Sequence, residues 1–161
     1  PQNGVLLDLM SSWRSHLPES FPKVKLVGLG LNAVEMAENP QLDEWVVHNV
    51  NTNPVLPFDD ASFDGAMVTV SIQYMTKPVE LFSEVGRVLK PGAAFHVIYS
   101  NRMFPTKAIL AWQAVDDDQR AHLIGSYFKN SGGWQMPELE DISPALGLPT
   151  DPVYVVSATL T

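Results

Sequence analysis

The chain has 161 residues, of which 45% are hydrophobic and 17% charged, a composition typical of one globular domain with a sizeable core. Its formal net charge of −8 repels phosphate backbones, so we expect no nucleic-acid partner. It has no cysteine and no apolar run near the roughly 20 residues that a bilayer requires. Disulfides, a thiol nucleophile and a membrane-spanning helix are therefore excluded.

The absence of cysteine is compatible with the cytoplasm or another reducing compartment. Because the first residue is Pro1, we expect the N-terminal part of the protein, with any targeting segment, to be missing. We interpret residues 1–161 as a single domain. Self-association into a homo-oligomer through an exposed Val-rich strand stays open.

Short strands and helices alternate in the first 50 residues. Apolar runs at residues 5–10, 25–28 and 45–47 predict three strands. A brief helix is expected over residues 12–17. A second helix is expected from Asn32 through Ala37, because Asn32 with Glu35 three residues later resembles a capping box.

The clearest pattern lies in the middle of the chain. Residues 66–72 form an apolar run rich in β-branched side chains, as a strand buried on both faces requires. Thr76 is expected to cap a helix whose apolar positions recur every three or four residues to Leu89. Lys90-Pro91-Gly92 should end that helix, and residues 94–99 predict the next strand. Strand, helix and strand over about forty residues indicate a parallel pair with a right-handed crossover.

The C-terminal third continues the alternation. A helix is expected over residues 105–115, and Asp116 with Gln119 predicts another that reaches Phe128 and ends at Gly132-Gly133. Residues 139–142 can form a short strand, and residues 153–160 predict a longer one. This order indicates an α/β protein with an open, doubly wound sheet.

The succession LPFDDASFDGAMV, SIQYM and EVGRVLKPGAAFHV resembles class I S-adenosylmethionine-dependent methyltransferases of the small-molecule, methyltransferase type 11 kind. The resemblance implies a Rossmann-like methyltransferase sheet of seven strands, mostly parallel, with an antiparallel C-terminal strand. It implies residues 45–47 at one edge and residues 153–160 beside residues 95–99. It also implies an enzyme that uses S-adenosylmethionine to methylate a small-molecule acceptor.

In an open parallel sheet, ligands bind over the carboxyl ends of the strands. The residues that follow each predicted strand are small or polar, which suits a ligand with hydroxyl and amine groups. The predicted cofactor-binding residues are Asp8, Met10, Ser11, Ser12, Gly28, Gly30, Leu31, Asn32, His48, Asn49, Val50, Asn51, Ser71, Ile72 and Gln73.

The resemblance implies roles for some of these residues. Its first strand leads into an acid and a glycine-rich loop near the amino-acid part of the cofactor; here Asp8 is present but the glycines are missing. The acid that accepts both ribose hydroxyls falls on Gly30, with Asn32 as a partial substitute. The acceptor for the adenine amine falls on Asn49, whose amide oxygen can still accept.

Methyl transfer requires approach geometry and a dry site, and a base only when the acceptor must lose a proton. His16 and Tyr74 are the candidate catalytic bases or orienting groups. Trp13, Asn101 and Arg102 are the candidates for contact with the acceptor substrate. The histidine spacing does not indicate a metal site.

Two other readings stay open. One is a methyltransferase-like binding or interaction module that has lost turnover, which the missing glycines would fit. The other is an NAD(P)-binding Rossmann protein, because residues 28–33 satisfy a G-x-G-x-x-A pattern between a strand and a helix.

Overall fold

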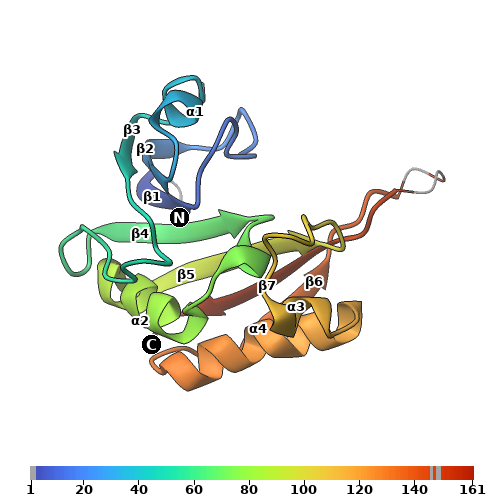
Figure 1. The fold of residues 1–161 in the computed structure, drawn as a ribbon. Coiled ribbons are helices and arrows are strands. Elements are labelled where there is room, and N and C mark those ends of the chain that lie inside the picture. The colour runs from blue at the N-terminus through green and yellow to red at the C-terminus, as the bar shows by residue number, and fades with distance from the viewer. Residues whose placement is uncertain (1–2, 146, 148–149) are drawn as a thin grey trace.

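The protein forms a single seven-stranded sheet in a computed structural model that describes residues 3–145, 147 and 150–161 (Figure 1). The strand order is β3-β2-β1-β4-β5-β7-β6. The strands are β1 (Gly4–Leu9), β2 (Lys23–Gly30), β3 (Glu44–Val47), β4 (Phe63–Thr69), β5 (Leu89–Ser100), β6 (Glu138–Asp141) and β7 (Val153–Thr159).

Strands β1 to β5 are mutually parallel, and β7 runs antiparallel to both of its neighbours, β5 and β6. The predicted mostly parallel sheet with an antiparallel C-terminal strand is therefore confirmed. So are the edge position of residues 45–47 and the pairing of β7 with β5. The strand order reverses between β1 and β4, which marks the place where such sheets bind ligands.

The helices are α1 (Ala33–Ala37), α2 (Pro78–Val88), α3 (Leu110–Gln113) and α4 (Asp117–Ser131), with a 3-10 turn, η1 (Ile72–Tyr74). Helices α2 and α4 lie side by side on one face of the sheet (Figure 1). Between them and β5, the rings of Phe82, Phe95 and Phe128 make edge-to-face contacts with centres 4.8 to 5.8 Å apart. A smaller apolar cluster of Leu6, Leu26 and Met67 lies apart from this main core.

Arg87, near the end of α2, connects this helix to the loop before β4, which is distant from it in the sequence. Its guanidinium donates to the carbonyl oxygens of Leu56 and Phe58, at 3.0 and 2.9 Å, and pairs with Glu84 and Asp60. Glu84 in turn accepts from the Leu56 N–H at 2.9 Å, and hydrogen bonds from Arg87 lower its pKa. The loop before β4 is thereby tied to α2, so the LPF and EVGR segments form one structural unit.

The predicted helix over residues 12–17 is wrong, because this segment is an irregular loop. The Ser15 hydroxyl donates to Asp8, and His16 has a φ of 59°, in the left-handed region that breaks a helix. The predicted helix over residues 105–115 is also too long, since only Leu110–Gln113 is helical.

The boundaries of α2 differ from the prediction at both ends. Lys77 is the N-cap residue instead of Thr76, and no side chain caps the helix. Strand β5 begins at Leu89, directly after the helix, so Lys90-Pro91-Gly92 lies within a strand instead of ending a helix. The pairing of β4 with β5 shifts register there, and Gly92 has a φ of 81°, which glycine adopts readily.

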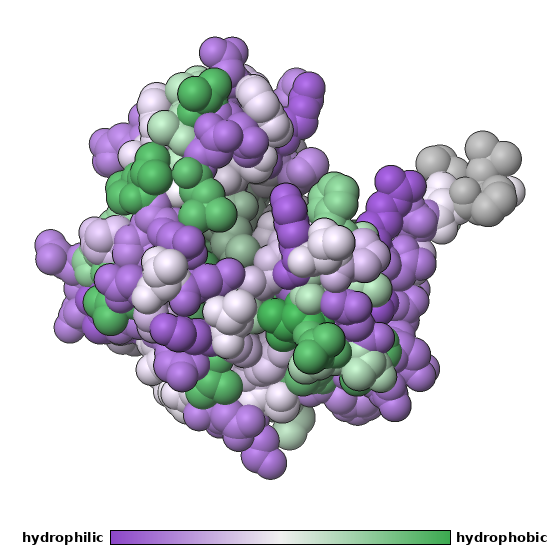
Figure 2. Space-filling model, in the orientation of Figure 1, coloured by the Kyte–Doolittle hydropathy of each residue, from purple (hydrophilic) through white to green (hydrophobic). Residues whose placement is uncertain are grey.

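The predicted helix start at Asn32, the strand over residues 139–142 and the capped helix at Asp116 are confirmed as α1, β6 and α4. The face of the molecule in Figure 2 is mostly hydrophilic, and its hydrophobic residues are scattered in small groups. No helix in the described part of the chain is both long and apolar enough to cross a membrane.

Candidate functional site

A cavity of about 730 Å³ lies at the carboxyl ends of β1 to β5. Its volume is in the range of small-molecule sites. The predicted residues that line it are Met10, Ser11, Ser12, Gly30, Leu31, Asn32, His48, Asn49, Val50, Asn51, Ser71 and Tyr74. The structure thus brings residues from four predicted strand ends, far apart in the sequence, to one site.

The loop after β1 is organised by Asp8, which is 2% exposed and does not line the cavity. Its Oδ2 accepts from the hydroxyls of Ser11 and Ser15, both at 2.6 Å. Burial raises the pKa of Asp8 to about 6, against the smaller lowering effect of the two serine hydrogen bonds. The carboxylate therefore acts from beneath the loop and sets the loop's shape.

The same contacts determine what the loop can offer a ligand. The Ser11 hydroxyl proton is used by Asp8, and the Ser12 hydroxyl donates to Glu35 at 2.7 Å. Both oxygens keep lone pairs, so this wall of the cavity presents acceptors. Met10 has a φ of 54°, the left-handed conformation that glycine favours, so the loop holds such a turn without a glycine.

Close packing explains the glycine at the very end of β2. A Cβ at Gly30 would collide with the Ser11 carbonyl oxygen, whereas one at Gly28 would first meet the flexible end of the Leu42 side chain, with Cδ1 2.7 Å away. Gly30 lines the cavity, whereas Gly28 does not. The strand that carries this G-x-G pattern is β2, next to the edge strand, and not a strand at the switch point.

The loop after β3 uses its polar groups internally. Asn49 Oδ1 accepts from the backbone N–H groups of Asn51 and Thr52, at 3.0 and 3.4 Å, so both lone pairs are occupied. His48 Nε2 lies 2.8 Å from the Asn53 carbonyl oxygen, which can only accept, so this nitrogen carries the proton. The geometry thus leaves Asn49 its amide N–H groups to offer a ligand.

Asn51 joins two strand ends. Its Nδ2 donates to the Tyr74 carbonyl oxygen at 2.9 Å, and its Oδ1 accepts from the Thr76 N–H at 3.0 Å. The Tyr74 hydroxyl in turn accepts from the Phe104 N–H at 3.1 Å. One chain of contacts therefore links the loops after β3, β4 and β5 around the cavity.

Several predicted site residues lie elsewhere. His16 lines a separate hollow of about 460 Å³ with Arg14, Glu19 and other loop residues. Ile72 and Gln73 are buried beneath the cavity wall, at 1% exposure each. The remaining predicted residues outside the cavity lining are Asp8, Trp13, Gly28, Asn101 and Arg102. Arg102 instead pairs with Asp151.

The cavity is also lined by Leu29, Glu35, Thr76, Phe104 and Lys107, and the sequence predicted no site role for Glu35, Thr76 and Lys107. In the sequence, Glu35 indicates only part of a helix cap. The Lys107 ammonium lies 5.6 Å from the centre of the Phe104 ring, in the segment after β5 that the sequence assigned to a helix. A search for charged residues within a few positions of each strand end would have found Glu35.

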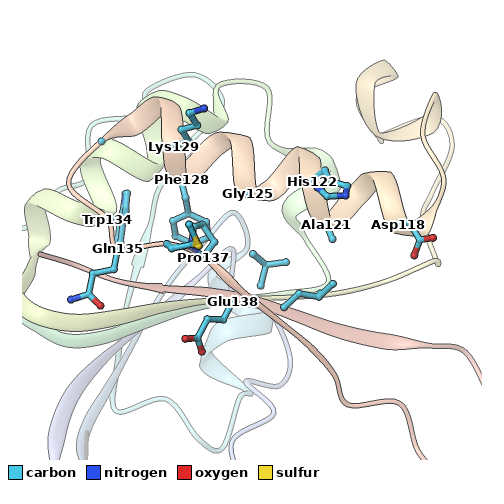
Figure 3. Close-up of a pocket in the computed structure, with 14 residues that line it drawn as sticks. Asp118, Ala121, His122, Gly125, Phe128, Lys129, Trp134, Gln135, Pro137 and Glu138 are labelled. Atoms are coloured by element: carbon cyan, nitrogen blue, oxygen red, sulfur yellow. The ribbon is translucent and has the colours of Figure 1, made fainter.

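A second hollow, of about 900 Å³, lies between α4 and β6 and shares no lining residue with the cavity. Figure 3 shows Phe128 pointing toward its interior and His122 and Lys129 along α4. A Cβ at Gly125 would have no neighbour within 4 Å, so the hollow is open above this glycine. Among the described residues, its lining does not include the carboxyl ends of the parallel strands, where ligands of such sheets bind, so the cavity is the candidate site.

Comparison with protein families and with known proteins gives several matches. A model for the methyltransferase domain matches residues 14–97, just over half of the chain. The biotin biosynthesis bifunctional protein BioHC of Teredinibacter turnerae is 31% identical over 114 residues, covering 63% of this chain and 20% of that protein. A malonyl-[acyl-carrier protein] O-methyltransferase of Hahella chejuensis is 29% identical over 124 residues, covering 72% of this chain and 43% of that protein. The chain thus spans less than half the length of these relatives.

Among solved structures, a putative S-adenosylmethionine-dependent methyltransferase from Listeria monocytogenes superposes with a TM-score of 0.67. The two are 11% identical, and the match covers 99% of this chain and 92% of that one. At this identity the likeness shows a shared fold.

Proposed function

Because the chain belongs to the methyltransferase domain family, we propose that it binds S-adenosylmethionine in the cavity at the strand ends and methylates an acceptor. The observation that carries this proposal is the convergence of Met10, Gly30, Asn49 and Ser71 on one cavity. These residues lie at or just after the ends of four different strands, and only the sheet topology brings them together.

The polar and apolar groups that line the cavity suit an adenosyl ligand. The walls offer a carboxylate at Glu35, hydroxyl oxygens at Ser11 and Ser12, and amide N–H groups at Asn49. Leu31 and Val50 supply apolar surface beside these polar groups. Such a mixture of apolar walls and a few polar groups is typical of small-molecule and cofactor sites.

The cofactor, when bound, supplies a sulfonium methyl group whose bond to sulfur breaks as the acceptor atom bonds to carbon. The protein's own residues orient the acceptor and exclude water. Tyr74 is placed for this role, because its hydroxyl accepts from the Phe104 N–H and keeps its own proton to donate. His16 is not part of this proposal, since it lies at another hollow.

We propose that the acceptor is a small molecule or small group that carries a negative charge. Lys107 is the cation at the end of the cavity formed by the segment after β5, and Phe104 beside it is 65% exposed. One relative is named for a malonyl group, and a carboxylate of this kind would pair with Lys107. Lys107→Met should therefore slow transfer to such an acceptor and leave cofactor binding nearly unchanged, whereas Lys107→Arg should keep both.

The second candidate is a binding module that no longer catalyses transfer. It is favoured by the hydroxyl protons of Ser11 and Ser12, which are used within the protein. Calorimetric titration with S-adenosylmethionine and S-adenosylhomocysteine tests both candidates. Micromolar binding followed by loss of the methyl group in the presence of an acceptor supports the enzyme. Binding without turnover over a panel of acceptors supports the module, and no binding of either ligand refutes the assignment of the site.

Titration with NAD⁺ and NADP⁺ tests the third interpretation, in which the G-x-G-x-x-A segment binds a dinucleotide. We expect no binding, because a close contact with the Ser11 carbonyl oxygen accounts for Gly30, and the segment follows β2 and not a strand at the switch point.

A further inference from the structure

We propose that the Glu35 carboxylate binds the ribose 2′,3′-diol of the adenosyl ligand. This inference rests on the proposed function, and it assigns the ribose to a residue of helix α1 instead of the end of β2. Glu35 lies in the first turn of α1 and is half-buried at the cavity wall.

The end of β2 cannot itself provide a side chain. The Ser11 N–H donates to the Leu29 carbonyl oxygen at 2.9 Å, which draws the loop after β1 across the end of β2. A Cβ at Gly30 would collide with the Ser11 carbonyl oxygen and lie 3.1 Å from Met36 Sδ. A polar side chain for this part of the cavity must therefore come from a neighbouring segment, and α1 follows directly.

The Glu35 carboxylate is held in place from both sides. Its Oε2 accepts from the Ser12 hydroxyl at 2.7 Å, and its Oε1 accepts from Asn32 Nδ2 at 3.2 Å. Asn32 is fixed in turn, because its Oδ1 accepts from the N–H groups of Val34 and Glu35 at the start of α1. A carboxylate bound in this way does not have to be ordered again when a ligand arrives.

The carboxylate keeps acceptor capacity for a ligand. An ionised carboxylate has about four lone-pair directions, and the hydrogen bonds from Ser12 and Asn32 use one on each oxygen. Two neighbouring hydroxyl groups of a ribose offer two donors to two such oxygens. Hydrogen bonds of this type to an ionised acceptor are stronger than neutral ones.

The charge of Glu35 also limits the class of ligand. Glu35 is the only carboxylate among the described residues that line the cavity, and Lys107 belongs to a different segment of its wall. A negative charge at this position repels a phosphate, so the subsite should accept an unmodified ribose and reject a 2′-phosphorylated one.

The test compares Glu35→Gln with Glu38→Gln, a matched change of an exposed glutamate at the C-cap of the same helix. Binding to each protein is measured by calorimetry with S-adenosylhomocysteine, with 5′-methylthioadenosine, and with the 2′-deoxy analogue of 5′-methylthioadenosine. We expect Glu35→Gln to weaken the first two ligands by about tenfold or more. The deoxy analogue should bind weakly to wild type and lose little further affinity in the variant. Glu38→Gln should bind all three as wild type does.

Each other outcome overturns the inference in a distinct way. If Glu35→Gln weakens S-adenosylhomocysteine but leaves 5′-methylthioadenosine unchanged, the carboxylate binds the amino group and not the ribose. If wild type binds the ligands and Glu35→Gln binds them equally well, Glu35 has no role in binding, but the proposed function stands. If wild type binds none of them, the proposed function fails and this assignment fails with it. Equal thermal unfolding temperatures for the two variants exclude a folding defect as the cause.

Discussion

Replacing Asp8 by Asn should change how the stability of the protein depends on pH. Asp8 lies at the end of β1, 2% exposed, and accepts from the hydroxyls of Ser11 and Ser15. Burial raises its pKa from 3.8 to about 6, so the folded state binds the Asp8 proton more tightly than the unfolded chain does. The contribution of Asp8 to stability is therefore greatest below about pH 4 and decreases as the pH rises through about 6.

The size of the stability change follows from the raised pKa of Asp8. A rise of roughly two pKa units corresponds to about 3 kcal/mol between the protonated and ionised forms of Asp8. An asparagine keeps a carbonyl oxygen for the two serine hydroxyls and carries no charge to desolvate. The stability of Asp8→Asn relative to wild type should thus improve by about 3 kcal/mol between about pH 4 and pH 8, whatever its offset at acid pH.

Urea unfolding of both proteins across this pH range measures the difference, in which the titration of the other carboxylates cancels. Asp64→Asn is the matched control, because hydrogen bonds from Val5 and Lys90 lower the Asp64 pKa. The control should lose stability at neutral pH, and that loss should shrink as the pH falls through the lowered pKa. A difference between Asp8→Asn and wild type that is constant with pH, or that grows toward acid, would refute the reasoning.

Three further substitutions test the packing around the cavity. Gly30→Ala should destabilise the protein by about 1–3 kcal/mol in urea unfolding, because its methyl group meets the Ser11 carbonyl oxygen; Gly125→Ala, at an open position, should not. Val70→Asn should raise stability by about 1 kcal/mol, since Val70 has a φ of 51° that asparagine tolerates better; an unchanged midpoint would contradict this. Asn51→Ala should cost about 1–3 kcal/mol and weaken binding of S-adenosylhomocysteine, because two strand ends lose their link; loss of stability alone would limit Asn51 to a structural role.

Hydrogen bonds within the protein determine the shape of the loops around the cavity. Asp8 binds the loop after β1, Glu35 joins that loop to α1, and Asn51 joins the loops after β3 and β4. A substitution of Asp8 or Asn51 should therefore affect stability and ligand binding together. Lys107, which is exposed and lies in the segment after β5, should affect acceptor transfer with little change in stability.

Much of the fold could be predicted from the sequence, because the decisive signals are local. The apolar run in β4, the periodic apolar face of α2 and the capping box at Asp116 each lie within a few residues of the element they define. Parallel pairing with a right-handed crossover follows from the order of these elements. The rule that ligands bind at strand ends then identified most of the residues that line the cavity.

The tertiary structure alone decided how individual side chains are used. Asp8 binds Ser15 seven residues away, and Asn39 Nδ2 donates to the Ser12 carbonyl oxygen at 2.9 Å, so the segment expected to be a helix is a loop. Glu35 reaches Ser12 across 23 residues of sequence and faces the cavity, whereas His16 turns to a different hollow. Periodicity records only which face of an element is apolar. The hydrogen-bond partner of a polar side chain depends on which segments the fold brings within about 3 Å of it.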